Sequence, residues 1–188
     1  MATQAVHGVD ELIGKLAAAA RLGDPAAITE RVKDELEAML GNGGLALPER
    51  CRETRTDRYA RHLLHSDPAG WSAVVMTWAP GQRTPLHDHA GLWCVEGVIE
   101  GRMEVLRYEL LDEDEGICRF APRGRLVAGV GEAGALIPPY DYHVLGNSQN
   151  RTSLTLHVYG GTMDHCSVFE PLGEDLFRRR VRTLVFDD

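Results

Sequence analysis

The stretch GQRTPLHDHAGLWCVEGVIEG, residues 81–101, places two histidines, His87 and His89, two positions apart between turn-forming and β-forming residues. In extended backbone the side chains of residues i and i+2 point to the same side, so both imidazoles can reach a single ion. Two such histidines also occur as surface or core residues, so the pair alone does not define a metal site. The segments on either side of it decide between these interpretations.

A third histidine, His143, follows the rigid turn-forming segment 138–142 (PPYDY). Beyond it, residues 153–159 (SLTLHVY) alternate strictly between polar and aliphatic side chains, which is typical of a β-strand. His157 lies on the polar face of this strand. That face either lines a pocket or faces solvent, and the alternation alone leaves both arrangements open.

The chain from residue 71 to residue 169 predicts a mainly β fold. Short runs rich in β-branched and aromatic residues are separated by turns rich in Gly, Pro, Asp and Asn, and no long helical stripe occurs among them. This pattern is typical of a small antiparallel barrel or jelly roll. The acidic run 112–115 predicts a hairpin tip, and the arginine-rich run 176–186 predicts an exposed last strand whose charges protect a sheet edge. The main predicted strands are 71–78, 94–99, 102–110 and 153–159.

Two amphipathic helices are predicted before the barrel. Apolar residues recur at helical spacing over 9–20 and again over 28–40, and Asp24-Pro25 has the form of an N-cap followed by proline at the first helical position. The two apolar stripes need a partner surface, which is either the barrel or a second subunit. We expect a single-domain monomer, residues 1–188, in which the helices (9–42) pack outside a barrel (59–170) that is followed by a C-terminal strand or tail (171–188).

The composition limits the classes of function. With 188 residues, of which 44% are hydrophobic and 26% charged, the chain is large enough for one globular domain with a core. A net charge of −8 argues against a surface for nucleic acid or anionic lipid, which needs clustered cations. No apolar run is long enough to span a bilayer, and the first residues lack the features of a signal peptide. The four cysteines form no CxxC motif, so we expect a cytoplasmic protein.

The spacing within residues 81–101 carries a resemblance to a known family. It reads G-x5-H-x-H-x4-C-x6-G, which resembles the first cupin motif with Cys94 where most cupins place a metal-binding glutamate. His143-x3-Asn147 resembles the end of the second cupin motif. A cupin that lacks this glutamate and keeps three histidines resembles the thiol dioxygenases, the family of cysteine dioxygenase and 3-mercaptopropionate dioxygenase. The resemblance covers residues 59–169 and implies a cupin-type antiparallel β-barrel.

The resemblance implies a non-haem Fe(II) ion held by His87, His89 and His143, without a carboxylate. Three neutral imidazoles on one side of the ion leave the opposite side open for substrate and dioxygen. In the alternative assignment His157 is the third ligand and His143 is a bystander. The place of His143 in the second motif favours the first assignment.

The same resemblance assigns roles to residues beside the metal. Thr155, His157 and Tyr159 resemble the family's Ser-His-Tyr triad, in which His157 orients the Tyr159 hydroxyl and Thr155 fixes the tautomer of His157. Cys94 and Tyr159 match the pair that forms a thioether crosslink in mammalian-type cysteine dioxygenase. Cys94 is otherwise a small buried hydrophobe, the usual fate of a cysteine that forms no disulfide.

The resemblance also implies a substrate class, small thiols that react with dioxygen. Tyr59 and Arg61 are similar to the segment whose arginine holds the substrate carboxylate in a bidentate, charge-assisted pair. The implied reaction adds both atoms of dioxygen to sulfur and gives a sulfinic acid. L-cysteine is the expected substrate, and the alternatives are 3-mercaptopropionate and mercaptosuccinate, with Arg83 or Tyr142 for a second carboxylate. The other classes are a different metal-dependent cupin enzyme and a non-catalytic binding module.

Overall fold

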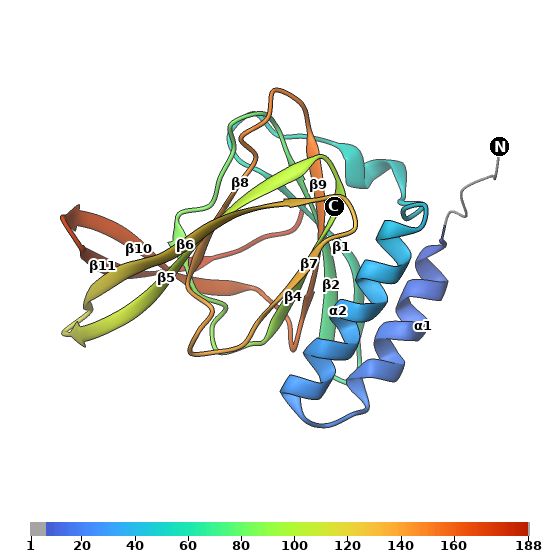
Figure 1. Ribbon diagram of the computed structural model, residues 1–188, viewed down its shortest axis with the longest axis horizontal. Helices are drawn as coiled ribbons and strands as arrows, with labels where there is room; N and C mark the ends of the chain where they lie inside the picture. Colours follow the sequence, from blue (N-terminus) through green and yellow to red (C-terminus); the bar gives the residue numbers. More distant parts are fainter. Residues whose placement is uncertain (1–6, 188) are drawn as a thin grey trace.

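The computed structural model describes residues 7–187. Helices α1 (Val9–Ala20) and α2 (Pro25–Gly41) lie side by side against one face of a sheet, and most other strands lie on the far side of that sheet (Figure 1). Both predicted helices are confirmed. The remaining elements are η1 (Glu49–Arg52), β1 (Ala60–Asp67), β2 (Trp71–Trp78), β3 (Leu86–His87), β4 (Cys94–Glu100), β5 (Arg102–Asp114), β6 (Ile117–Gly129), β7 (Ala133–Leu136), β8 (His143–Gly146), β9 (Ser153–Tyr159), β10 (His165–Gly173) and β11 (Leu176–Thr183).

The strands form two sheets. The first has the order β1-β2-β9-β4-β7, and the second joins β10-β11-β6-β5-β8-β3 and closes on itself where β3 pairs with β10. Every pairing between these strands is antiparallel. In the first sheet β9 lies between β2 and β4, so strands distant in sequence become neighbours. The predicted mainly β jelly roll with two N-terminal helices is confirmed.

The central strands of the first sheet, β2, β9 and β4, are buried on both faces. The outer face of this sheet contributes Val75 and Leu156 to an apolar core that also contains Leu16 and Leu36 of the two helices. Its inner face contributes Trp78 and other side chains to a second core inside the barrel. All seven residues of β9 are buried, the aliphatic ones under the helices. The polar face of β9, which the sequence left unassigned, therefore lines the interior of the barrel.

The apolar stripes of both helices pack on the barrel of the same chain and not on a second subunit. The Asp24 carboxylate accepts a hydrogen bond from the Ala27 backbone N–H (2.9 Å) and caps α2, as predicted. Gly97 on β4 allows α2 to approach the sheet closely, because a Cβ at this position would lie 3.0 Å from Leu40 Cδ1. None of the helices within residues 7–187 is long and apolar enough to cross a bilayer.

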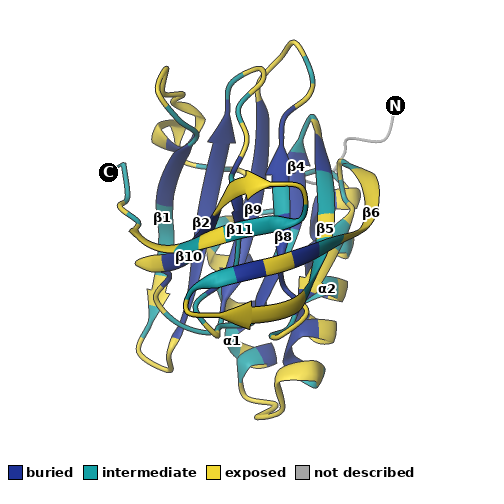
Figure 2. Cartoon of the chain, turned by 90° about the vertical axis from the view of Figure 1, so that its left-hand side faces the viewer, coloured by how far each residue is buried: buried dark blue, intermediate teal, exposed yellow. Residues whose placement is uncertain are grey.

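Two long hairpins, β5–β6 and β10–β11, project from the barrel away from the helices (Figure 1). Their outer parts are exposed, whereas the strands of the first sheet behind them are buried (Figure 2). The turn at Glu115-Gly116 confirms the predicted hairpin tip. The predicted last strand, β11, is largely exposed but pairs with β10 along its length and with β6 at its start, so only part of it is a free edge.

We predict that Leu36→Ala lowers the free energy of unfolding by about 2–5 kcal/mol, because it opens a cavity between α2 and the first sheet. Leu36 is 0% exposed, whereas Leu22, in the turn after α1, is 54% exposed. The matched variant Leu22→Ala should change stability by less than about 0.5 kcal/mol. Urea denaturation measures both, and equal effects would contradict this account of helix packing.

Candidate metal centre

Three imidazoles meet inside the barrel. His87 ends β3, His89 follows two residues later, and His143 begins β8, where it is the register partner of His87. The ring centroids of His87 and His143 lie 4.5 Å apart, those of His89 and His143 5.1 Å, and those of His87 and His89 5.3 Å. One nitrogen from each ring lies within 4.8 Å of the other two. This is the group that the sequence analysis assigns as metal ligands.

Each of these imidazoles is held through its outer nitrogen. His87 Nδ1 lies 3.1 Å from the Pro85 carbonyl oxygen, His143 Nδ1 lies 2.9 Å from the Asp141 carbonyl oxygen, and His89 Nδ1 lies 3.3 Å from Asp141 Oδ2. Because these acceptors require a proton on Nδ1, the lone pair of each neutral ring is on Nε2. Asp141 also accepts a hydrogen bond from the His89 backbone N–H (3.0 Å), so this residue, which the sequence analysis missed, positions two of the three rings.

The inner nitrogens fit a metal ion. Among the described residues, Nε2 of His89 and Nε2 of His143 are buried, and the ion-pair partner of each is a carboxylate oxygen of Glu96, which is costly unless a metal ion or a proton uses the lone pairs. Burial lowers the pKa of His87 well below its ordinary value, and it also lowers the pKa of His89. Neutral imidazoles are the ligands that Fe, Zn, Cu and Ni ions accept. His87, His89 and His143 could therefore hold one divalent transition-metal ion.

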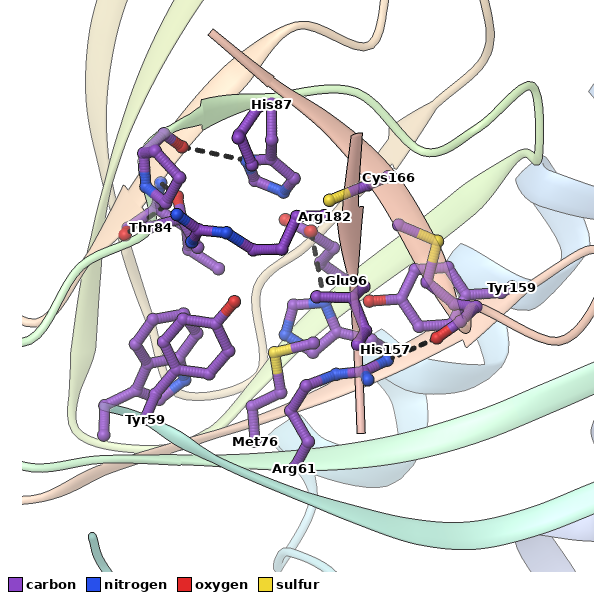
Figure 3. A pocket seen from close by; sticks show the side chains of 16 residues that line it. Tyr59, Arg61, Met76, Thr84, His87, Glu96, His157, Tyr159, Cys166 and Arg182 are labelled. Atoms are coloured by element: carbon purple, nitrogen blue, oxygen red, sulfur yellow. Dashed lines mark hydrogen bonds and ion pairs between the residues drawn. The ribbon is translucent and has the colours of Figure 1, made fainter. Parts of the chain in front are cut away.

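A carboxylate that the sequence analysis did not consider lies beside two of these rings. Glu96 Oε1 lies 3.1 Å from His157 Nδ1 (Figure 3). The same oxygen lies 3.3 Å from His143 Nε2 and 3.9 Å from His89 Nε2. Burial opposes ionisation of Glu96, but His143 and His157 hold its pKa well below the ordinary value. The sequence alone could have indicated this position of Glu96, because residues 94 and 96 of a strand face the same side and Cys94 occupies the ligand position of the first cupin motif.

His143 responds to the same carboxylate. Burial lowers the pKa of His143, but the charge and hydrogen bond of Glu96, together with the carbonyl and charge of Asp141, outweigh burial and leave that pKa above its ordinary value. A proton on Nε2 competes with a metal ion for the same lone pair. Metal binding at His143 therefore strengthens as the pH rises and this proton is lost.

The predicted triad on β9 is connected differently from the expectation. Trp78 Nε1 donates to Thr155 Oγ1 (2.9 Å), and Thr155 Oγ1 lies 2.7 Å from His157 Nε2. Thr155 thus holds one ring nitrogen of His157, as expected. The other nitrogen faces Glu96 and not the hydroxyl of Tyr159, whose ring is stacked with the His157 ring at 6.1 Å between centroids. The reason is the register of β4 and β9, which pairs Glu96 directly with His157.

Tyr59 and Arg61 form one wall of the cavity beside the histidines (Figure 3). Tyr59 stacks on Trp78 with 4.5 Å between ring centroids. Arg61 is 2% exposed, and its guanidinium donates to the carbonyl oxygens of Met163 (2.8 Å) and Val185 (3.3 Å). A guanidinium has five N–H donors, so three remain, including the unpartnered Nε–H. Arg61 can therefore still bind a carboxylate.

A second arginine reaches the same cavity and was not predicted. Arg182 of β11 lies across the cavity beside His87 (Figure 3), although the sequence analysis assigns the arginines of this strand to edge protection. Arg83 and Tyr142, considered for a second carboxylate, lie elsewhere: Arg83 pairs with Glu104 (2.6 Å), and Tyr142 belongs to a separate aromatic cluster. The cavity has a volume of about 20 Å³, so a thiol can enter only if side chains on its exposed side move.

Cys94 and Tyr159 are register partners on β4 and β9, and both are buried in the inner core. Burial raises the pKa of the Cys94 thiol and the pKa of the Tyr159 hydroxyl well above their ordinary values. Cys166, which lines the cavity, has its pKa raised by burial to about 11. These thiols are protonated at neutral pH and are weak nucleophiles.

A jelly-roll barrel with a cluster of imidazoles in its interior defines a cupin. The family model for cysteine dioxygenase type I matches residues 50–171. The chain therefore belongs to the cysteine dioxygenase type I family, and the family resemblance that the sequence motifs carry is confirmed.

The curated relatives are distant. The chain is 22% identical over 116 residues to cysteine dioxygenase type 1 of Danio rerio and 19% identical over 114 residues to that of Homo sapiens. Each match covers 60% of this chain and 56% of the relative, so the chain spans little more than half the length of these proteins.

Solved structures with detectable similarity include two bacterial proteins. One is an uncharacterized conserved protein with a double-stranded β-helix domain from Klebsiella pneumoniae, with a TM-score of 0.47, 19% identity and coverage of 65% of this chain and 94% of that one. The other is a Cupin 2 conserved barrel domain protein from Salinispora arenicola, with a TM-score of 0.43, 19% identity and coverage of 61% and 85%.

We predict that His143→Ala weakens Fe(II) affinity by more than about 100-fold, because even changes to groups that only position a ligand cost about 10–100-fold. Competition with a chromophoric chelator and metal analysis measure the effect. The matched control is His165→Ala, which removes an exposed imidazole from β10. Equal affinities in the two variants would exclude His143 as a ligand.

Proposed function

We propose that the protein is a non-haem Fe(II) thiol dioxygenase that converts a small carboxylated thiol, with L-cysteine as the first candidate, to its sulfinic acid. The observation that carries the proposal is the convergence of one ring nitrogen from each of His87, His89 and His143, with His87 lining a cavity that is walled by Arg61. Membership of the cysteine dioxygenase type I family supports it.

The chain's own residues would position the thiol. An Fe(II) ion bound by the three histidines supplies an acidic centre that favours thiolate over thiol and brings dioxygen close to sulfur. Arg61 would hold the substrate carboxylate through its remaining N–H donors, since a planar fork matches a carboxylate in two-point contact. Tyr159, also in the cavity wall, would offer its hydroxyl to substrate or dioxygen.

A second candidate substrate class is a dicarboxylic thiol such as mercaptosuccinate. Arg182 favours it, because two guanidinium groups, of Arg61 and Arg182, line one small cavity. 3-Mercaptopropionate is the third candidate, since Arg61 alone suffices for its single carboxylate. We also propose that the protein acts as a monomer, because the apolar stripes of both helices are already covered by the barrel.

The first test is dioxygen uptake by the Fe(II)-loaded protein with L-cysteine, 3-mercaptopropionate, mercaptosuccinate and cysteamine. We expect uptake with carboxylated thiols, one dioxygen for each sulfinate formed. Arg61→Lys should raise KM for these thiols by about 10–100-fold, because lysine cannot replace the two-point contact. Cysteamine has no carboxylate, so its rate of dioxygen uptake should be the same in Arg61→Lys as in the wild type.

Two controls separate this role from structural damage. Arg180→Lys makes the same change at an exposed position of β11 and should leave KM unaltered. Loss of turnover with every thiol, cysteamine included, would show that Arg61 supports the fold and does not bind the carboxylate. Absence of uptake across the panel by iron-loaded protein would contradict the proposed function itself.

We further propose that a thioether joins Cys94 Sγ to a ring carbon of Tyr159. Bond formation removes one hydrogen from the thiol and one from the ring, with dioxygen as the oxidant, so the joined tryptic peptides should weigh two hydrogens less than their sum. Peptide mass mapping after aerobic turnover measures this. Cys118→Ser, a buried cysteine on β6, is the matched control for Cys94→Ser. Unmodified, separate peptides after turnover would contradict the crosslink.

A further inference from the structure

Glu96 is the one acidic side chain that β4 directs into the barrel. Alternate residues of a strand face opposite sides, and Cys94 and Val98 belong to the inner core, whereas Val95 and Ile99 belong to the core under the helices. Glu96 therefore has to point inward, and it lines the cavity. A carboxylate in such a place is costly unless cations or donors surround it.

The partners of this carboxylate are all imidazoles. Within residues 7–187, the ion-pair contacts of Glu96 are to His89, His143 and His157, and no lysine or arginine is among them. The facing nitrogens of these rings, two Nε2 atoms and one Nδ1 atom, are buried and have no other hydrogen-bond partner there. Glu96 thus lies where the lone pairs of His89 and His143 converge.

The distances suit shared coordination. Nitrogen and oxygen donors lie about 2.0–2.2 Å from a divalent transition-metal ion, so neighbouring donors on one ion are separated by about 3.0–3.5 Å. Glu96 Oε1 lies 3.3 Å from His143 Nε2 and 3.9 Å from His89 Nε2, so a small shift lets the carboxylate share an ion with these two rings, whereas His87 is not among its ion-pair contacts. His157 faces the same oxygen at 3.1 Å and is fixed from behind by Thr155. This contact holds the carboxylate in place.

We propose that Glu96 is the fourth protein donor to the metal ion held by His87, His89 and His143, and that His157 positions it. The carboxylate that the first cupin motif lacks at Cys94 is thus supplied two residues later on the same strand face. This assignment explains why a buried glutamate is directed at three imidazoles.

One consequence concerns the substrate, and it rests on the proposed function. With Glu96 as a fourth protein donor, fewer positions on the ion would remain for substrate, and the amine of L-cysteine would have to compete for them with the thiolate and dioxygen. The amino group of L-cysteine then adds little through the metal. The choice between substrates then depends on how Arg61 and Arg182 bind the carboxylate, which both thiols have. L-cysteine and 3-mercaptopropionate should therefore bind the metal-loaded protein with similar dissociation constants.

The test begins without any thiol. Fe(II) affinity is measured by chelator competition for wild type, Glu96→Gln and Glu96→Leu, and Glu35→Gln on α2 is the matched control, since it neutralises a buried glutamate on the other side of the sheet. We expect affinity to fall by about 10–100-fold in Glu96→Leu, by less in Glu96→Gln, whose amide oxygen remains, and not at all in Glu35→Gln. Unchanged affinity in Glu96→Leu would overturn the proposal.

A crystal structure of the Co(II)-loaded protein shows whether Glu96 binds the ion directly or only compensates the charge near it. Anomalous scattering should place the ion about 2.0–2.2 Å from a Glu96 carboxylate oxygen. A distance beyond hydrogen-bond length would overturn the proposal even if affinity had fallen. Both results are independent of turnover, so a protein that binds metal through Glu96 but oxidises no thiol would refute the proposed function and leave this site intact.

The substrate consequence has its own measurement, anaerobic thiol binding at saturating Fe(II). In wild type the dissociation constants of L-cysteine and 3-mercaptopropionate should be similar. In Glu96→Leu a position becomes open to the amine, so L-cysteine should bind about tenfold more tightly relative to 3-mercaptopropionate. The same ratio in both proteins would overturn the claim that Glu96 excludes the amine.

Discussion

The burial of the strands β2, β9 and β4 on both faces of their sheet is the constraint on which the rest of the structure depends. Two helices cover its outer face with aliphatic contacts, so the polar side chains of β9 and β4 have only the barrel interior to face. Polar groups enclosed in this way must satisfy one another or bind an ion. The helices, although distant from the site, are therefore part of the reason that it exists.

Within that interior, hydrogen bonds fix the direction of every imidazole. The acceptors behind His87, His89 and His143 take their Nδ1 protons, which leaves the Nε2 lone pairs directed inward. At His157 the arrangement is reversed: Thr155 Oγ1 accepts from Trp78 and lies 2.7 Å from His157 Nε2, so its own hydroxyl can donate to this nitrogen and leave a proton on Nδ1, which faces Glu96. Two of the acceptors behind the first three rings are backbone carbonyl oxygens, so the backbone conformation itself fixes the orientation of His87 and His143. A centre arranged in this way needs little reorganisation to receive a metal ion.

Much of this arrangement could be predicted from the sequence. Motif spacing and strand periodicity predicted the barrel, both helices and the group His87, His89 and His143. They could not show which face of β9 is inside, because that depends on what the helices cover. Glu96 was missed because the motif directs attention to position 94, although strand alternation places both side chains on one face. Arg182 reaches the cavity because the β10–β11 hairpin is held against β3, a strand distant in sequence, by the pairing of β10 with β3.

The central claim is that this cavity transfers both atoms of dioxygen to the sulfur of a bound thiol. The most direct test is turnover of the Fe(II)-loaded protein under ¹⁸O₂ in ordinary water, with mass analysis of the product. The account predicts a sulfinic acid that carries two ¹⁸O atoms and no oxygen from solvent. A product with one labelled atom, or oxidation to disulfide alone, would contradict it.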